Sequence, residues 1–342
     1  MKYFKNSAIK LLLGFLLIGF ATNATAQNRA AAVQAYNQAL DLQNAENYQQ
    51  AIDMFSQAKA QAQQAEDAGE KGQDIIELVN KKLPRLYYNL AGSKYSEFQQ
   101  DKTMANLDAT IDAFKEARGI AEEYNDEEFA SKSSQVVTKL LYSKSILQYR
   151  NKNHDAALAT LDQVTERDPN YAQAYYQKAI VIKNKPESTV ENYLAAIDKA
   201  IEVGNANNPD VVSQAKESVV EELVYRGANA TENKNYSRAE DLLNKALNYD
   251  AQNANVHYRL AEAYNKQVKS DQAISHARKA LDYENGGRTA RAKIYFELAT
   301  ALKIKGNIEE ACSAFKNAAY GEFKSPAEHQ MEYELKCDSA TN

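Results

Sequence analysis

One short pattern of residues recurs seven times along this chain and limits its fold more than any other feature. A usually small residue is followed four positions later by a usually bulky one, and three positions after that mostly by Ala. Successive copies begin 59, 47, 36, 46, 34 and 38 residues apart, a period that stretches but does not shrink. Such spacing predicts stacked copies of one small unit, which is a solenoid. The copies are Ala51/Phe55/Ala58, Thr110/Phe114/Ala117, Ala157/Leu161/Val164, Tyr193/Ile197/Ala200, Ala239/Leu243/Ala246, Ala273/Ala277/Ala280 and Ala311/Phe315/Ala318.

Each copy is predicted to belong to the second of two antiparallel helices. Its residues recur at helical spacing and therefore share one face, where the small ones let a neighbouring helix approach and the bulky ones fill the gap. The 342 residues include only 12 Gly and 5 Pro, and the alternating β-branched clusters typical of sheets are missing. These features predict an all-α solenoid of helical hairpins.

The hairpins are predicted to form an array over residues 27–322, followed by a capping helix and tail over 323–342. Pro84 predicts a kink or short break at 82–84, because Pro disrupts a helix interior. Ser325 is expected to cap the last helix, with Pro326 as its first helical residue and Glu328 as the reciprocal capping acid. The seven units are predicted at about 30–64, 75–124, 127–168, 172–203, 211–249, 254–284 and 290–320.

Residues 1–26 have the features of a cleaved signal peptide. A basic start precedes an apolar run from Leu11 to Phe20, which is too short for a stable membrane anchor. Ala24 and Ala26 supply the small residues of a cleavage site, so we expect the cut before Gln27 and export to the periplasm, with secretion as the alternative. Since no later segment is apolar enough, the mature chain is not expected to span a membrane.

The charge of the mature chain disfavours nucleic acid as a partner. The whole sequence has 41 basic and 46 acidic residues, and the leader contains three Lys and no acid. Its removal leaves 38 and 46, a net charge of −8, which would be repelled by a phosphate backbone.

Cys312 and Cys337 are the two cysteines of the sequence. In an oxidising compartment they are expected to form a disulfide that ties the final helix onto the last repeat. The alternative is that Cys312 is a small buried residue and Cys337 a free thiol.

The hairpins resemble the tetratricopeptide repeat. The segment Asn235–Glu240, together with Gly227 upstream, matches the repeat best, and the sixth, seventh and first units carry the same theme. The resemblance implies a right-handed α-solenoid of about seven hairpins, of a type common in Gram-negative cell envelopes. The sequence departs from the family in having no Trp, in Thr110 and Tyr193, and in three elongated units.

No residues suggest catalysis, a metal site or a cofactor. The four His residues do not pair with one another or with Cys at metal-ligand spacing, and His154 and His257 are expected to be structural. A phosphate-binding glycine loop and a nucleophile elbow are also missing. An enzyme is therefore the least expected class.

The resemblance implies that the first helices line a concave groove that binds peptides or partner helices. Beside the packing residue these helices carry a row of mostly aromatic residues, followed by a row of mostly polar ones, and either could contact a partner. The alternative is that the aromatic row is default packing. The candidates for partner contact are Tyr36, Tyr88, Tyr142, Tyr176, Tyr225, Tyr258, Arg259 and Phe296.

These features predict a protein-binding adaptor of the periplasm that presents a rigid groove to a peptide or partner protein. One alternative is a structural or self-associating subunit, as a homo-oligomer or within an outer-membrane assembly. Another is an accessory in glycan or peptidoglycan handling, which the lack of Trp disfavours.

Overall fold

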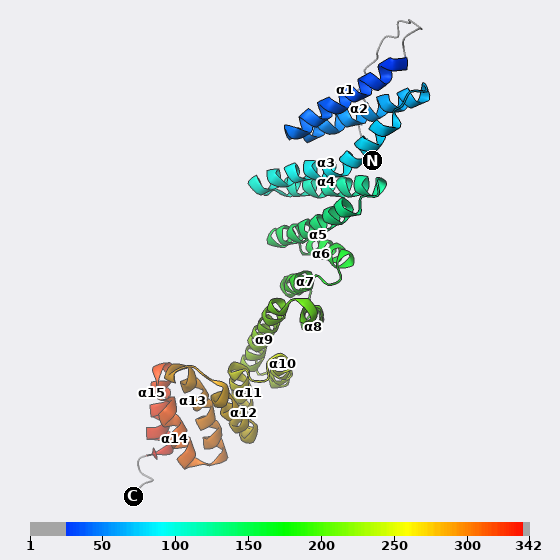
Figure 1. The fold of residues 1–342 in the computed structure, drawn as a ribbon. Coiled ribbons are helices and arrows are strands. Elements are labelled where there is room, and N and C mark those ends of the chain that lie inside the picture. The colour runs from blue at the N-terminus through cyan, green and yellow to red at the C-terminus, as the bar shows by residue number, and fades with distance from the viewer. Residues whose placement is uncertain (1–24, 338–342) are drawn as a thin grey trace, which may run out of the picture. The chain divides into compact units, whose positions relative to one another are not determined.

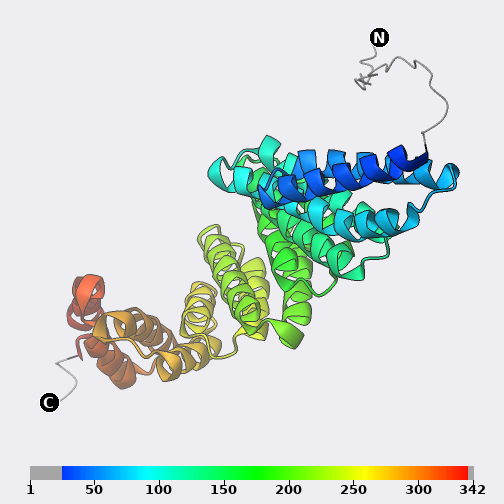
Figure 2. The same ribbon diagram turned by 45° about the horizontal axis from the view of Figure 1, so that its top comes forward.

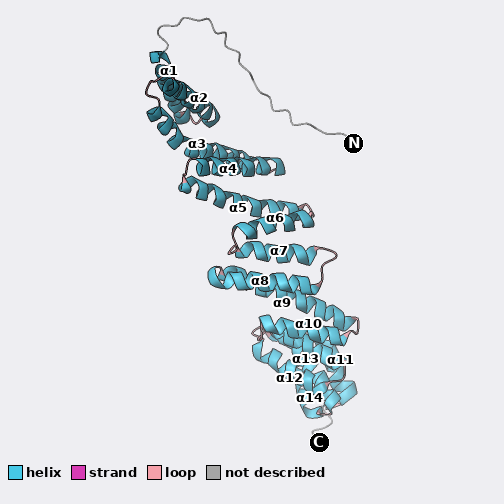
Figure 3. Cartoon of the chain, turned by 90° about the vertical axis from the view of Figure 1, so that its right-hand side faces the viewer, coloured by secondary structure: helices cyan, strands magenta, loops and turns pink. Residues whose placement is uncertain are grey.

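The computed structural model describes residues 25–337, and over these residues it contains helices and loops but no strand (Figures 1 and 3). Over these residues fourteen helices follow one another, and a short helical segment comes last. The helices are α1 (Thr25–Asn44), α2 (Tyr48–Asp67), α3 (Gln73–Gln100), α4 (Met104–Glu123), α5 (Glu127–Arg150), α6 (His154–Arg167), α7 (Ala172–Asn184), α8 (Val190–Asn207), α9 (Pro209–Glu232), α10 (Tyr236–Tyr249), α11 (Ala254–Lys266), α12 (Ser270–Tyr283), α13 (Arg288–Lys305), α14 (Ile308–Ala318) and α15 (Lys324–His329).

The chain divides into two compact units between Leu147 and Gln148, near the end of α5. The first unit holds α1 to α4 and most of α5, and the second holds α6 onward. Within the first unit α1 packs on α2, α2 on α3, and α3 on α4. In the second, each helix from α6 to α14 packs on the next one (Figure 2). The first helices α7, α9, α11 and α13 also contact one another in sequence. The fold is thus an all-α helical repeat solenoid.

The recurring pattern forms the core of both units. All 21 residues of the seven copies are at most 3% exposed, including the two departures, Thr110 and Tyr193. The Thr110 hydroxyl lies 2.7 Å from the Asn106 carbonyl of its own helix and 3.0 Å from the Lys94 carbonyl on α3, and its one proton is donated between these two acceptors inside the hairpin. The Tyr193 hydroxyl lies 3.1 Å from Ser218 Oγ on α9. The hydroxyls of both Thr110 and Tyr193, the two residues that replace the usual small residue, therefore have a hydrogen-bond partner on a neighbouring helix.

The turn inside a hairpin has one backbone geometry in five places. A residue with positive φ follows the first helix, and the next residue donates its N–H to the carbonyl five positions back, as in a Schellman turn. The residues with positive φ are Glu46, Lys152, Lys234, Val268 and Gly306. Because only the last of them is Gly, four of these turns hold an L-residue in the left-handed region.

Pro84 does not break α3, which runs unbroken from Gln73 to Gln100. The helix bends in its first half instead (Figure 1). Pro84 is buried, and Leu83 and Leu86 beside it are at most 5% exposed. The apolar surface buried on this face offsets the hydrogen bond that Pro cannot donate. The predicted short break is therefore wrong, and the bend agrees with the predicted kink.

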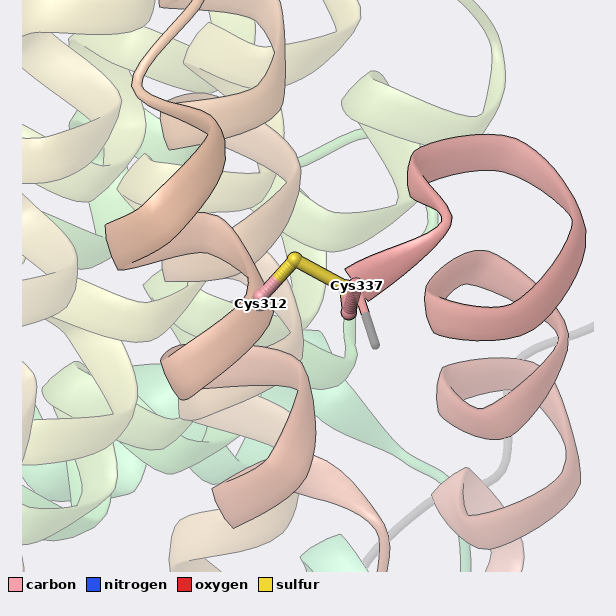
Figure 4. Close-up of a disulfide and its surroundings, with 2 residues drawn as sticks. All are labelled: Cys312 and Cys337. Carbon is pink, nitrogen blue, oxygen red and sulfur yellow. A yellow bond between two sulfur atoms is a disulfide. The ribbon is translucent and has the colours of Figure 1, made fainter. Parts of the chain in front are cut away.

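The end of the chain is covered by a short helical segment. A 3₁₀ turn at Gly321–Phe323 leads into α15, and a π-helical turn at Gln330–Leu335 follows. Both α15 and this turn pack on α14. A disulfide joins Cys312 of α14 to Cys337, with the two Cα atoms 5.7 Å apart (Figure 4). It anchors the last turn to the final hairpin.

The expected cap at Ser325 is wrong. The 3₁₀ turn leaves Phe323 already in the helical region of φ and ψ, so α15 begins at Lys324 without a side-chain cap. Pro326 still lies in the first turn of the helix, where a missing N–H costs no hydrogen bond.

The expected signal peptide, residues 1–26, lies outside the described residues except for its last two, with which α1 begins. Among residues 25–337, no helix has both the length and the apolarity needed to cross a bilayer.

Candidate functional site

The candidate residues lie on the odd-numbered helices, each of which is the first helix of its hairpin. We call two sets of positions there the aromatic row and the polar row. The aromatic row is Tyr36, Tyr88, Tyr142, Tyr176, Val224, Tyr258 and Phe296. The polar row follows it by one residue and is Asn37, Asn89, Ser143, Gln177, Tyr225, Arg259 and Glu297.

Three members of the aromatic row pack edge-on against the bulky residue of the following helix. Tyr36 meets Phe55 at a centroid distance of 5.3 Å and an angle of 72°. Tyr88 meets Phe114 at 5.5 Å and 73°, and Phe296 meets Phe315 at 5.4 Å and 73°. An edge-to-face contact of this kind stabilises the hairpin beyond its buried area. One side of each ring is therefore committed to packing.

The remaining members of the aromatic row are also largely withdrawn from solvent. Tyr142, Tyr176 and Val224 are half-buried, and Tyr258 is only 8% exposed. Burial raises the pKa of the Tyr258 hydroxyl to about 12, with the acidic side chains of Glu262 and Glu297 adding to the shift. Most of the aromatic row thus leaves little side-chain surface open to a partner.

Tyr225 is the exception among the candidates. It belongs to the polar row of α9, and 64% of its surface is exposed. Its predecessor Val224 occupies the packing position of that helix and packs against the core of the second unit. Since a large aromatic ring gains little by standing in water, Tyr225 is the candidate best placed to contact another molecule.

Two cations lie over the Tyr258 ring, one from α11 and one from α13. The Arg259 guanidinium lies 5.1 Å from the centre of the Tyr258 ring, and Lys293 Nζ lies 4.9 Å from it. Arg259 also donates to Glu262 Oε2 at 2.8 Å. The buried ring therefore fixes two cations at the surface between α11 and α13.

A buried polar link joins α11 to α13. Asn265, 8% exposed, donates through Nδ2 to the Glu297 carboxylate at 2.7 Å and to the Glu297 carbonyl at 2.9 Å. Burial raises the pKa of the Glu297 carboxyl, and the bond from Asn265 opposes that rise. Sequence reasoning placed Glu297 in the polar row but missed Asn265, whose only signal is its position two helical turns after Tyr258.

Sequence reasoning also missed a histidine pair. His257 Nδ1 of α11 lies 2.9 Å from His276 Nδ1 of α12, and His257 Nε2 lies 3.2 Å from the Ala251 carbonyl. The sequence spacing gave no sign of this pair, because the two residues are 19 positions apart and face each other only across the hairpin. Burial lowers the pKa of both, that of His276 to about 4. The two rings pack against each other and against Tyr264 and Tyr283.

Over residues 25–337, no three side chains of His, Cys, Asp or Glu come together as a metal site would require. The groups gathered on the first helices are hydrogen-bonding, charged and aromatic ones, which suit reversible contact with another macromolecule.

A family model described as the tetratricopeptide repeat matches residues 292–320, which cover most of α13 and all of α14. That hairpin is a tetratricopeptide repeat, and the other six share its register. No curated protein matches the sequence.

Several solved structures are similar in fold. MamA from Desulfovibrio magneticus RS-1 is 20% identical over 55% of this chain and 96% of its own, with a TM-score of 0.33. A tetratricopeptide repeat protein from Parabacteroides merdae is 14% identical over 88% of this chain and 99% of its own, with a TM-score of 0.28. The P58(IPK) TPR domain is 10% identical over 91% and 99%, with a TM-score of 0.32.

Proposed function

We propose that this tetratricopeptide repeat protein is a periplasmic scaffold that binds a segment of a partner protein on its first helices, without any covalent step. The repeat itself supports a role in protein–protein interaction. The observation that carries the proposed site is Tyr225. It is a large aromatic side chain, 64% exposed, on α9, a first helix that contacts both α7 and α11.

The neighbours of Tyr225 suit a segment that carries both apolar and charged groups. On α9 itself, Glu222 is 14% exposed and accepts from Arg226 Nε at 2.6 Å, while Lys183 of α7 lies 3.8 Å from the same carboxylate. On α11, Arg259 is held against Tyr258. The paired charges of Glu222 and Arg226, which lie within one turn of Tyr225 on α9, would orient a partner, and the exposed ring would supply most of the contact area.

The periplasmic part of the proposal is supported by two features. The leader over residues 1–26 has the basic start, apolar run and small-residue cleavage site of an exported protein. The disulfide between Cys312 and Cys337 is stable in an oxidising compartment. The test is cell fractionation with mass spectrometry of the mature chain. A periplasmic protein that starts at Gln27 supports the proposal, and a cytoplasmic one that retains Met1 contradicts it.

The binding site is tested by capturing the partner in its native envelope. Tagged protein would be crosslinked there and the co-purifying proteins identified. We expect one or two recurrent partners, lost on Tyr225→Ala and retained on Tyr333→Ala. Tyr333 is the matched control, since it is also 64% exposed but lies on the covering segment at the end of the chain. Equal capture of the partner by both variants would show that Tyr225 is not part of the binding site. Recovery of the protein alone would favour self-association.

A further inference from the structure

The first unit carries a cavity on its first helices that the proposed site in the second unit does not use. The cavity has a volume of about 280 Å³ and is formed where the last turn of α1 meets α3. Three of its lining side chains are basic, two are polar and two are leucines. They are Lys81, Lys82, Arg85, Gln43, Asn89, Leu78 and Leu86.

The three cations lie within five consecutive residues of α3. Lys81 and Arg85 are four residues apart, so they stand one above the other on the helix surface, and Lys82 lies beside them. Lys81 and Arg85 are exposed and Lys82 is half-exposed. Their side chains can therefore converge on one ligand over the mouth of the cavity.

No carboxylate forms a close ion pair with these cations. Among the described residues, none lies within 4.0 Å of Lys81, Lys82 or Arg85, although Glu77, Asp126 and Glu127 line a neighbouring cavity together with Lys81. Arg85 does lower the pKa of the Glu128 carboxyl, but the hydrogen bond from Lys132 is the larger cause. On the second helix α4, by contrast, Lys115 and Arg118 are paired at 3.2 and 2.8 Å.

The carbonyl groups at the end of α1 do not neutralise the cations either. The Gln43 carbonyl accepts from the N–H of Glu46, and the Leu42 carbonyl accepts from that of Asn47. The concentration of positive charge is also local, because acidic side chains outnumber basic ones by 18 to 13 over residues 25–147. A ligand that stays at this cavity must therefore supply negative charge.

The leucines narrow the class of ligand. Leu78 is 46% exposed at the rim, and Leu86, 1% exposed, forms the base. A small inorganic anion would leave Leu78 in water, whereas a peptide with aliphatic and acidic side chains covers it.

We propose that this cavity binds an acidic segment of the partner protein, with carboxylates on Lys81, Lys82 and Arg85 and an aliphatic side chain on Leu78. Arg85 is the residue that can hold a carboxylate through two parallel hydrogen bonds, and the lysines act as point charges. The inference rests on the proposed function and assigns the first unit a part in it that differs from that of Tyr225.

The test uses the full mature chain and a labelled hexapeptide of alternating leucine and glutamate with blocked ends. Fluorescence anisotropy would measure its binding. We expect affinity to fall about tenfold in a variant with Lys81→Gln, Lys82→Gln and Arg85→Gln. The matched control carries Lys102→Gln, Lys115→Gln and Arg118→Gln, which removes two lysines and one arginine elsewhere in the first unit and should leave the affinity unchanged.

Three outcomes would overturn the inference. They are equal binding of a leucine–glutamine hexapeptide, unchanged affinity in the cavity variant, and an equal loss in the control variant. Binding should also weaken as salt rises from about 0.05 to about 0.5 M, since exposed charges are screened. The helical circular dichroism and the Tm of both variants would verify folding.

The hexapeptide experiment tests the cavity independently of the capture experiment that tests Tyr225. Tyr225→Ala should bind the hexapeptide as the unaltered chain does, while the cavity variant should lose it. A failure of the cavity therefore leaves the capture result for Tyr225 standing, and the reverse also holds.

Discussion

Two hairpins, α1 with α2 in the first unit and α11 with α12 in the second, carry the recurring pattern at the same positions. They differ in the side chains that join their two helices. The first has helices of 20 residues each and joins them through alanines, Ile52 and the edge-on pair of Tyr36 and Phe55. The second has helices of 13 and 14 residues and places a histidine pair between them. The comparison teaches that the small positions determine how closely the helices approach, while the remaining contacts can be apolar or polar.

The second unit also has a polar link between two first helices and a covered end. Asn265 of α11 donates to Glu297 of α13, and a segment held by a disulfide covers the final hairpin. Exposed ends of a solenoid need such a cover because no further repeat buries their apolar face.

The largest expected effect comes from removing the aromatic core of one unit at a time. Phe55→Ala and Phe315→Ala each delete a ring that is at most 1% exposed, and each should cost about 3–5 kcal/mol. Hydrogen exchange would locate the loss. Phe55→Ala should expose amides of α1 and α2 and spare α13 and α14, and Phe315→Ala should do the reverse. Uniform loss along the chain in either variant would show that the two units unfold as one.

The next effect sharpens the contrast at the end of the chain. Replacing both cysteines, Cys312→Ser and Cys337→Ser, opens a loop with a sequence separation of 25 residues. The chain-entropy model gives a cost of about 3–4 kcal/mol for a loop of that size. Amide protection should fall from α14 to Leu335, whereas α1 to α4 stay as they were. Unchanged protection of α15 would mean that packing alone holds the cover.

The histidine pair predicts that acid weakens the hairpin of α11 and α12. Because the folded pKa of each His lies below its ordinary value of 6.5, the unfolded chain binds more protons at acidic pH. The contribution to stability is complete above pH 6.5 and is lost as the pH falls towards the His276 value of about 4.

The measurement is hydrogen exchange in α11 and α12 at several pH values, corrected for intrinsic rates. In His276→Gln, which cannot ionise, the loss of protection between pH 6.5 and about 4 should be smaller than in the unaltered chain. Glu297, whose pKa is raised, acts in the opposite sense and is present in both proteins. An identical pH dependence of the two would contradict the prediction.

The smallest expected effect concerns a turn. Val268, 68% exposed, has a φ of 57°, which a β-branched residue adopts with strain, and Gly306 occupies the equivalent turn of the next hairpin. Val268→Gly should therefore raise stability by about 0.5–1 kcal/mol, the relief of strain being partly offset by the greater freedom of Gly in the unfolded chain. The reciprocal change, Gly306→Val, should lower the Tm. A lower Tm for Val268→Gly would show that the valine contributes contacts that outweigh its strain.

Much of the fold could be predicted from local pattern. The small and bulky residues of each copy are buried because their spacing places them on one face of a helix, and this requires no knowledge of the partner helix. The turns and the pairing of the helices follow in the same way. The candidate site was less predictable, since Tyr225 and Tyr258 are both tyrosines of first helices, yet one is 64% and the other 8% exposed.

The sequence by itself determined the repeat, its all-α class and the residues that fill its core, because helical periodicity is a local property. The tertiary structure alone decided which polar groups meet. His257 faces His276, Asn265 faces Glu297, and among the described residues Lys81, Lys82 and Arg85 of α3 form no close ion pair. Such contacts depend on how far each helix slides and turns against its neighbour, and differences of one helical turn leave the periodicity unchanged while replacing every partner.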